Sequence, residues 1–266
     1  MDKKIMSMQN PRIKGAVKLR GRRERDKTQT FLIEGYRELL RAVEGSAKLQ
    51  TLFYSPEHFL GSNEKSLIDQ IRASNVEVFE VSKEVFAKVS YRDRPDGLIA
   101  LARQTHQMLA DLTVSDNPFI LIAEAIEKPG NLGSILRSCD AAGVDALLLC
   151  DRCTDIHNPN VVRSSVGTLF SVPVIETTSD AALEWLHKHK IPLICSTPAA
   201  EKIYTAVDQK GPVAIAVGTE QLGLSQTWLD AANLLVRIPM LGHSDSLNVA
   251  AATTLLLYEV IRQRTS

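Results

Sequence analysis

The stretch that decides the fold is VRIPMLGHSDSLNVAAATTLLLY, residues 236–258. It begins with a short apolar strand ending at Pro239, continues through a polar loop with Gly242 and Ser246, and ends in a helix that is apolar on nearly all sides. We therefore expect the loop between a strand's carboxyl end and a helix N-terminus, where α/β proteins bind anionic or nucleotide-like ligands. Ser246 is expected to cap the helix, with Asn248 just inside it, and capping alone would also explain both residues.

Two polar loops upstream also follow apolar strands, and they carry further candidate site residues. They are EKPGNLGSILRSCDAAG, residues 127–143, and AVGTEQLGLS, residues 216–225. In the first, Asn131 lies at the start of a helix and Arg137 about two turns into it, although a plain surface position would also explain the arginine. In the second, two glycines let a ligand approach the backbone on either side of the Glu220 carboxylate.

The pattern of strands and helices predicts two α/β domains. Short strands and helices alternate over the first hundred residues, and a second alternation with continuous apolar strands follows, which is typical of a mostly parallel sheet covered on both faces. We predict a smaller α/β domain at residues 1–105, a linker at 106–117 and a larger α/β domain at 118–266.

The net charge of zero is unevenly distributed along the chain. Residues 1–27 hold ten Lys or Arg against three acidic residues, which leaves 21 basic and 28 acidic residues in the rest of the chain. A basic leader of this kind favours a polyanionic partner, with a solvated arm or a targeting peptide as alternatives.

Several functional classes are disfavoured. No apolar run approaches the ~18 residues of a membrane helix, and the glycine fingerprints GxGxxG and GxxxxGKS/T are absent. Cys150 and Cys153 form a CxxC near His157, but a fourth metal ligand is missing, and a thioredoxin-like pair would open a helix rather than follow a strand. We therefore expect reduced thiols in a cytoplasmic protein, with no metal.

The three loops resemble motifs one, two and three of the SpoU (TrmH-type) RNA 2′-O-methyltransferases of the SPOUT superfamily. Asn131, Gly133 and Arg137 resemble motif one, GTEQLGLS at 218–225 resembles motif two, and IPMLG followed by SLNV resembles motif three. NPNVVRSSVGTLFSVPV resembles a further family segment, and NPRIKGAVKL, FLIEGYREL and RPDGLIALA resemble the family's N-terminal substrate-binding domain. The resemblance covers nearly the whole chain and departs at Ala250, where many members have Ser.

The resemblance implies a C-terminal α/β trefoil-knot (SPOUT) domain with a mostly parallel sheet, preceded by a smaller α/β RNA substrate-binding domain. It also implies S-adenosylmethionine as the cofactor, a homodimer, and methyl transfer to a ribose 2′-hydroxyl. The two-domain layout favours ribosomal over transfer RNA, and we expect 23S ribosomal RNA as the substrate. The implied cofactor-binding residues are Thr197, Gly218, Ile238, Met240 and Leu247. The implied catalytic residues are Asn131, Arg137, Glu220, Ser246 and Asn248.

The chemistry of these side chains limits their roles. A guanidinium is effectively never deprotonated in proteins, so we expect Arg137 to hold the adjacent phosphate and stabilise the developing alkoxide, while Asn131 orients the reacting groups. Two alternatives stay open at this point: a transfer-RNA 2′-O-methyltransferase, and a non-catalytic RNA-binding or ribosome-assembly protein on the same scaffold. Loss of Asn131, Arg137 or Ser246 would have favoured the non-catalytic protein, and all three are present.

Overall fold

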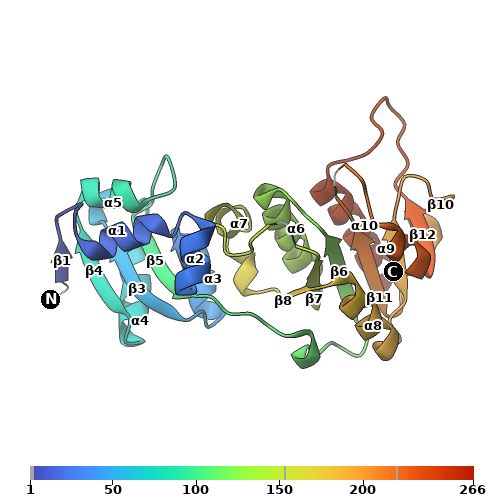
Figure 1. Ribbon diagram of the computed structural model, residues 1–266, viewed down its shortest axis with the longest axis horizontal. Helices are drawn as coiled ribbons and strands as arrows, with labels where there is room; N and C mark the ends of the chain where they lie inside the picture. The colour runs from blue at the N-terminus through green and yellow to red at the C-terminus, as the bar shows by residue number, and fades with distance from the viewer. Residues whose placement is uncertain (1–2, 153, 220) are drawn as a thin grey trace. The chain divides into compact units, whose positions relative to one another are not determined.

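The computed structural model divides into two compact units that each contain more than one piece of the chain (Figure 1). The described residues are 3–152, 154–219 and 221–266. The first unit comprises Met1–Thr105 and Asp155–Ser171, and the second comprises His106–Thr154 and Val172–Ser266. The segment Asp155–Ser171 thus packs with the N-terminal part of the chain, although it lies between two strands of the second unit.

The first unit is built on a five-stranded sheet in the order β1-β4-β3-β5-β2. Its strands are β1 (Lys3–Ile5), β2 (Thr30–Glu34), β3 (Leu49–Tyr54), β4 (Glu77–Val81) and β5 (Leu98–Arg103). Strand β4 is parallel to both of its neighbours, β1 and β3, whereas β5 is antiparallel to both β3 and β2. Strand β5 thus lies between β3 and β2 and pairs with both.

Helices cover both faces of this sheet. They are α1 (Pro11–Lys18), α2 (Arg22–Thr28), α3 (Tyr36–Glu44), α4 (Glu64–Ala73), α5 (Lys83–Val89), α7 (Pro159–Ser164) and the 3₁₀ turns η1 (Pro56–His58) and η3 (Thr168–Phe170). Alternate residues of a strand point to opposite faces. Leu32 accordingly packs in the cluster that includes residues of α1 and α5, while Phe31 and Ile33 pack in the cluster that includes residues of α3 and α4.

The basic leader is part of the first unit's fold rather than a solvated arm. Strand β1 pairs with β4, and α1 buries Ile13 and Ala16 completely. In α2, the side chain of Arg25 is 1% exposed and donates two hydrogen bonds to Asp155 Oδ2, at 2.9 and 2.6 Å. The solvated-arm alternative is therefore wrong for the described part of the leader.

The second unit is built on a seven-stranded sheet in the order β10-β12-β9-β11-β6-β7-β8, and every neighbouring pair is parallel. Its strands are β6 (Phe119–Glu124), β7 (Ala146–Cys150), β8 (Val174–Thr177), β9 (Leu193–Ser196), β10 (Lys202–Ile203), β11 (Val213–Val217) and β12 (Leu234–Arg237). The predicted α/β class with a mostly parallel sheet is confirmed. Because all strands run the same way, their carboxyl ends lie at one edge of the sheet.

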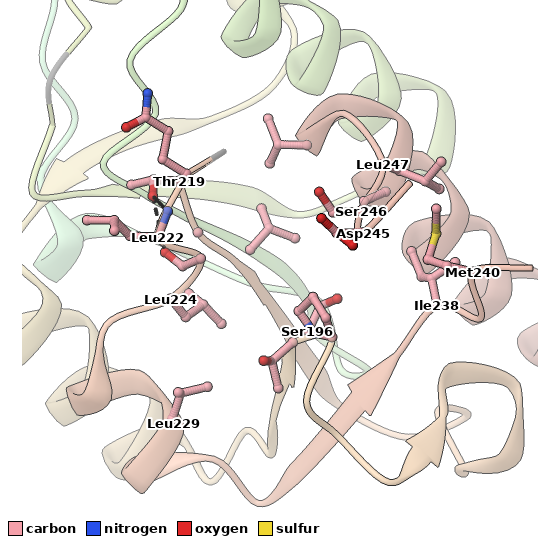
Figure 2. A pocket seen from close by; sticks show the side chains of 18 residues that line it. Ser196, Thr219, Leu222, Leu224, Leu229, Ile238, Met240, Asp245, Ser246 and Leu247 are labelled. Carbon is pink, nitrogen blue, oxygen red and sulfur yellow. Dashed lines mark hydrogen bonds between the residues drawn. The ribbon is translucent and has the colours of Figure 1, made fainter. Parts of the chain in front are cut away.

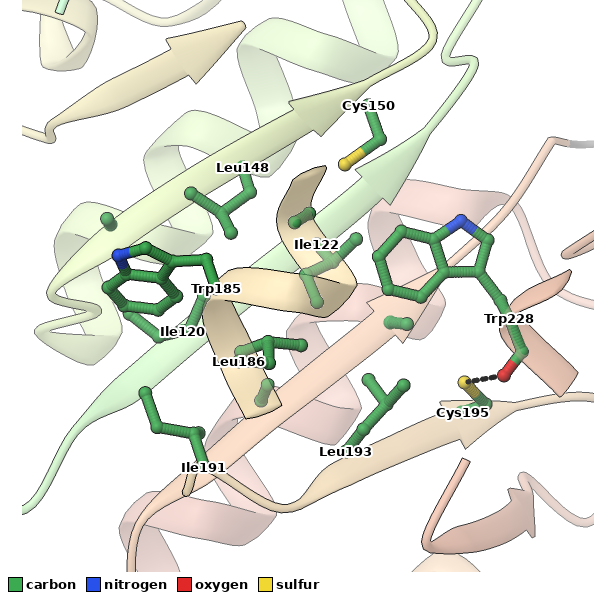
Figure 3. Packing of buried hydrophobic residues seen from close by; sticks show 14 of the residues in the cluster. Ile120, Ile122, Leu148, Cys150, Trp185, Leu186, Ile191, Leu193, Cys195 and Trp228 are labelled. Carbon is green, nitrogen blue, oxygen red and sulfur yellow. Dashed lines mark hydrogen bonds between the residues drawn. The ribbon is translucent and has the colours of Figure 1, made fainter. Parts of the chain in front are cut away.

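The central strands β6, β7 and β11 are buried at every position because helices cover both faces, and all of their residues except Glu124 are apolar. The helices are α6 (Pro129–Ala142), α8 (Ser179–His189), α9 (Gln226–Ala231), α10 (Val249–Arg264) and the 3₁₀ turns η2 (Leu109–Asp111) and η4 (Tyr204–Ala206). Figure 3 shows the face covered by α8 and α9, where Trp185, Leu186 and Trp228 pack over Ile122 and Leu148. The buried indole N–H of Trp228 donates to Ser179 Oγ at 2.8 Å.

The chain between α7 and η3 leaves the helical conformation at Val166 and Gly167, which have positive φ angles of 52° and 84°. One local prediction is wrong. The closing helix α10 is capped by Asn248, whose side chain accepts from Ala250 N, and not by Ser246, which lies in the preceding loop. Ser246 therefore does not have the predicted capping role. Within the described residues, no helix is long and apolar enough to cross a bilayer.

Candidate functional site

A cavity of about 390 Å³ lies at the carboxyl edge of the parallel sheet in the second unit. Its walls are the segments that follow three adjacent strands, β9, β11 and β12, together with the start of α10. Figure 2 shows side chains from these segments facing one another across the cavity, with the oxygens of Asp245 and Ser246 directed into it. The site thus forms where parallel α/β sheets commonly bind ligands.

The structure brings together all five residues that were predicted to bind the cofactor. Each of them lines this cavity, as does Ser246 from the predicted catalytic set; the five are Thr197, Gly218, Ile238, Met240 and Leu247. They come from three loops that are separated by up to fifty residues of sequence but follow neighbouring strands. Thr197 N donates to Val236 O at 2.9 Å, which fixes the first of these loops against the end of β12.

The loop after β11 is held in a tight turn. Thr219 and Gly223 exchange two backbone hydrogen bonds of 3.0 and 3.1 Å, and Thr219 Oγ1 accepts from Leu222 N at 3.0 Å. Beyond the turn, Ser225 N donates at 2.8 Å to the carboxylate of Glu124, which is buried at the end of β6. Glu124 was not predicted from the sequence to be part of the site. An acidic residue at the end of an otherwise apolar strand could have indicated a carboxylate that holds a neighbouring loop.

We expect Gly218→Ala to weaken cofactor binding strongly. A Cβ at Gly218 would overlap the backbone of Gly223 and Leu224, and backbone cannot rotate aside as a flexible side chain would. Overpacking of this kind costs about 1–3 kcal/mol, so binding of S-adenosylmethionine, measured by calorimetry, should fall roughly tenfold to a hundredfold.

The matched control is Gly211→Ala in the same unit, where a Cβ would meet no atom within 4 Å. Equal affinities for the two variants would show that the close backbone approach at Gly218 does not shape the cofactor cavity.

Two of the predicted catalytic residues are joined directly. Asn248 Nδ2 donates to Asn131 Oδ1 at 3.1 Å, so the residue that caps α10 also orients the first turn of α6. The two helices are tied again farther along by a 2.7 Å hydrogen bond between the hydroxyls of Ser138 and Thr254. These contacts fix the Asn131 amide relative to the loop that carries Ser246.

The other predicted catalytic residues are placed differently. Arg137 is exposed on α6 and is not among the residues that line the cavity. Its guanidinium has no hydrogen-bond or ion-pair partner among the described residues, so all of its donors are available to a ligand. Glu220 lies outside the described residues.

Of the two cysteines in the CxxC sequence, only Cys150 is among the described residues. Cys150 is buried at the end of β7, and burial raises the pKa of its thiol well above the ordinary value, which keeps it protonated. His157 belongs to the first unit, where its ring lies 4.5 Å from that of Phe31. Cys153 lies outside the described residues, and among the described ones no group of three His, Cys, Asp or Glu side chains is placed to hold a metal ion.

Comparison with known proteins identifies both parts of the chain. Residues 118–258 match the model of the SpoU rRNA Methylase family, and residues 10–100 match that of the MRM3-like substrate binding domain. The SpoU match includes the loops around the cavity, and the substrate-binding match includes most of the first unit's sheet.

Relatives match over nearly the full length. A solved RNA 2′-O ribose methyltransferase is 42% identical with a TM-score of 0.87, covering 99% of this chain and 100% of its own. The S-adenosylmethionine-bound rRNA methyltransferase of Sinorhizobium meliloti is 29% identical with a TM-score of 0.91, covering 99% of each chain. The 23S rRNA (guanosine(2553)-2′-O)-methyltransferase of Bacillus subtilis (strain 168) is 28% identical, covering 97% of this chain and 99% of its own. Together with the geometry of the cavity, these matches show that the chain belongs to the SpoU rRNA methylase family.

Proposed function

We propose that this protein transfers a methyl group from S-adenosylmethionine to a ribose 2′-hydroxyl of 23S ribosomal RNA. The observation that carries the proposal is the cavity at the sheet's carboxyl edge, whose walls are the loops that belong to the matched SpoU rRNA methylase region. The full-length match to a 23S rRNA 2′-O-methyltransferase favours ribosomal RNA over transfer RNA. We place the reaction in the cytoplasm.

The cavity suits the proposed cofactor in size and chemistry. Its volume of about 390 Å³ is within the range of small-molecule sites. Apolar side chains such as Leu224 and Val249 suit an adenine ring, while the Asp245 carboxylate and the Ser246 hydroxyl can bind polar groups. When bound, S-adenosylmethionine supplies a sulfonium methyl group that is already activated for transfer. The chain's task is therefore to align and deprotonate the acceptor.

In this mechanism the 2′-hydroxyl oxygen would form a bond to the methyl carbon as the carbon–sulfur bond breaks, so that the cofactor would leave as a neutral thioether and the hydroxyl proton would pass to water. Arg137 holds the phosphate next to the ribose with two parallel N–H donors and stabilises the negative charge that develops on the oxygen. Asn131, held by Asn248, orients the ribose. Ser246 at the cavity wall and Glu220 complete the set of polar groups around the acceptor.

We assign RNA binding to the domain predicted at residues 1–105, which is followed by the linker at 106–117 and the methyltransferase domain at 118–266. Part of the leader's charge is neutralised within the fold, since Lys4 and Arg12 pair with Glu80 and Glu77. Within α1 and α2, the exposed cations that have no ion pair among the described residues are Lys14, Lys18, Arg23 and Lys27.

The double substitution Lys14→Ala and Lys18→Ala should weaken RNA binding and flatten its salt dependence. Each lost phosphate contact lowers the slope of log K against log salt concentration by roughly 0.7–0.9. Fluorescence titrations of labelled 23S RNA fragments at several salt concentrations measure this slope. An unchanged slope would mean that α1 does not contact phosphates, and cofactor binding should be the same in both proteins.

The protein is also proposed to be a homodimer that uses one face of α10. Leu256 and Leu257 are buried within the chain, but Leu255 and Tyr258 are 40% and 48% exposed. These two side chains are one helical turn apart, so they lie on the same face and present apolar area to a second copy. Sedimentation of the purified protein tests this, and a monomer at micromolar concentration would contradict it.

The decisive experiment measures transfer of labelled methyl from S-adenosylmethionine to total RNA. The RNA is separated by size and then digested with alkali, which cannot cleave after a 2′-O-methylated ribose. We expect the label in large-subunit RNA, within an alkali-resistant dinucleotide. Label in the transfer-RNA fraction would support the transfer-RNA alternative instead, and absence of both transfer and cofactor binding would support the non-catalytic scaffold protein.

A further inference from the structure

The cavity at the carboxyl edge of the second unit's sheet has almost no charged side chains in its walls. Its described lining consists mainly of apolar side chains, hydroxyls and backbone groups, such as those of Leu224, Ser246 and Gly218. The one charged side chain among the described lining residues is that of Asp245, in the loop between β12 and α10. Glu220, in the turn after β11, lies outside the described residues. Within the described walls, a ligand therefore meets a single formal charge, and that charge is negative.

The carboxylate of Asp245 is accessible to a ligand. The residue is exposed, and its oxygens are directed into the cavity (Figure 2). No hydrogen bond or ion pair joins this carboxylate to another described residue. A cation that enters the cavity is therefore attracted by a negative charge and does not have to displace an internal partner.

The cofactor differs in charge before and after methyl transfer. The ammonium and the carboxylate of its amino-acid part balance each other, whereas the sulfonium of S-adenosylmethionine has no counter-charge within the molecule. In S-adenosylhomocysteine, which remains after transfer, the sulfur is a neutral thioether. A carboxylate near the sulfur therefore attracts the methylated form and loses this attraction for the demethylated one.

The position of Asp245 beside Ser246 puts its charge at the end of the cavity where methyl transfer is proposed. The hydroxyl of Ser246, a predicted catalytic residue, is directed into the cavity next to this carboxylate (Figure 2). Transfer requires the methyl carbon to reach the ribose oxygen, so the sulfur has to lie at the same end as the groups that hold the ribose. The sulfonium and the Asp245 carboxylate are therefore expected at the same end of the cavity.

We propose that Asp245 is a specificity-determining residue that favours S-adenosylmethionine over S-adenosylhomocysteine by charge, an inference that rests on the proposed function because it requires this cofactor. The carboxylate attracts the sulfonium of the incoming cofactor, and that attraction ends when the methyl group has been transferred. The demethylated cofactor is thereby replaced more readily by a fresh molecule, which limits inhibition by the product.

Calorimetric titrations of the unaltered protein and of Asp245→Asn test this in the absence of RNA. The ligands are S-adenosylmethionine, S-adenosylhomocysteine and sinefungin, an analogue that keeps a positive charge because a carbon with an amino group replaces the methylated sulfur. We expect Asp245→Asn to bind the two ligands that carry this charge roughly threefold to tenfold more weakly, because an attraction between partly solvated charges is lost. Its affinity for S-adenosylhomocysteine should not change, which also shows that the variant is folded.

Two further variants serve as controls. Asp116→Asn makes the same chemical change at an exposed position just before β6, at the amino edge of the sheet and so opposite the cavity. It should leave all three affinities unchanged, and Asp245→Glu, which keeps the charge, should retain most of the preference. The proposal is overturned if the ratio of the dissociation constants of S-adenosylhomocysteine and S-adenosylmethionine is the same in Asp245→Asn and the unaltered protein. An equal weakening of all three ligands would mean that the carboxylate binds the ammonium that they share.

Methyl transfer to 23S RNA, measured on the same preparations, separates this inference from the proposed function. A charge preference that depends on Asp245, without transfer to any RNA, supports the role of Asp245 and counts against the proposed activity. Normal transfer with the same preference in Asp245→Asn overturns the role of Asp245 alone. Failure of the unaltered protein to bind any of the three ligands contradicts both.

Discussion

Replacing Arg137 with Ala is expected to lower the rate of methyl transfer roughly a hundredfold to a thousandfold, the usual effect of removing one preorganised donor from a developing oxyanion. Arg137 is exposed on α6 with its donors uncommitted among the described residues, so a substrate phosphate does not have to compete with an internal partner. The rate is measured under single-turnover conditions with saturating S-adenosylmethionine, which separates the chemical step from binding.

The cofactor provides the internal control for this prediction. Because Arg137 does not line the cofactor cavity, the affinity for S-adenosylmethionine should be the same in Arg137→Ala and the unaltered protein. Arg137→Lys should fall between them, since an ammonium keeps the charge but cannot form two parallel hydrogen bonds to a phosphate. Lys188→Ala removes an exposed cation from α8 and should have full activity. Full activity in Arg137→Ala would rule out the proposed role.

The fold of the second unit was predictable because its sequence signals are local. Unbroken apolar runs such as FILIA and ALLLC indicated buried parallel strands, and the polar loops after them indicated the edge where a ligand binds. The resemblance to the SpoU motifs then supplied the individual residues, and the five assigned to the cofactor do line one cavity. Periodicity alone could not have joined loops so far apart in sequence.

What the sequence could not show depends on long-range packing. The leader reads as a run of charge, yet Ile13, Ala16 and Arg25 are buried in it, because partners far along the chain supply apolar contacts and a carboxylate. Glu64 and Asp96 likewise look like ordinary surface acids. Both nevertheless line a cavity in the first unit, where the first turns of α3 and α4 meet the segment before β5.

Replacing Arg25 with Ala is expected to reduce the free energy of unfolding by about 3–5 kcal/mol, because it leaves a buried carboxylate without its partner. Arg25 donates to Asp155 through Nε and Nη2, and its Nη1 donates to the carbonyls of Leu19 and Arg20 at 2.9 and 2.8 Å. The matched control in the same helix is Arg22→Ala, which removes an exposed 3.6 Å ion pair with Asp26 and should cost at most about 1 kcal/mol. Urea unfolding of each variant measures the difference.

The same ion pair should make the stability depend on pH in a defined direction. Burial opposes ionisation of Asp155, but hydrogen bonds from Arg25 and from His157 N outweigh it and hold the pKa of this carboxyl below its ordinary value of 3.8. A group whose pKa is lowered on folding stabilises the protein fully above its unfolded pKa and loses that contribution as the pH falls toward the folded value. The stability difference between the unaltered protein and Arg25→Ala should therefore be constant above about pH 5 and shrink in more acidic solution. A difference that is independent of pH down to the acid transition, or equal costs for Arg25→Ala and Arg22→Ala, would show that packing rather than charge holds α2 in place.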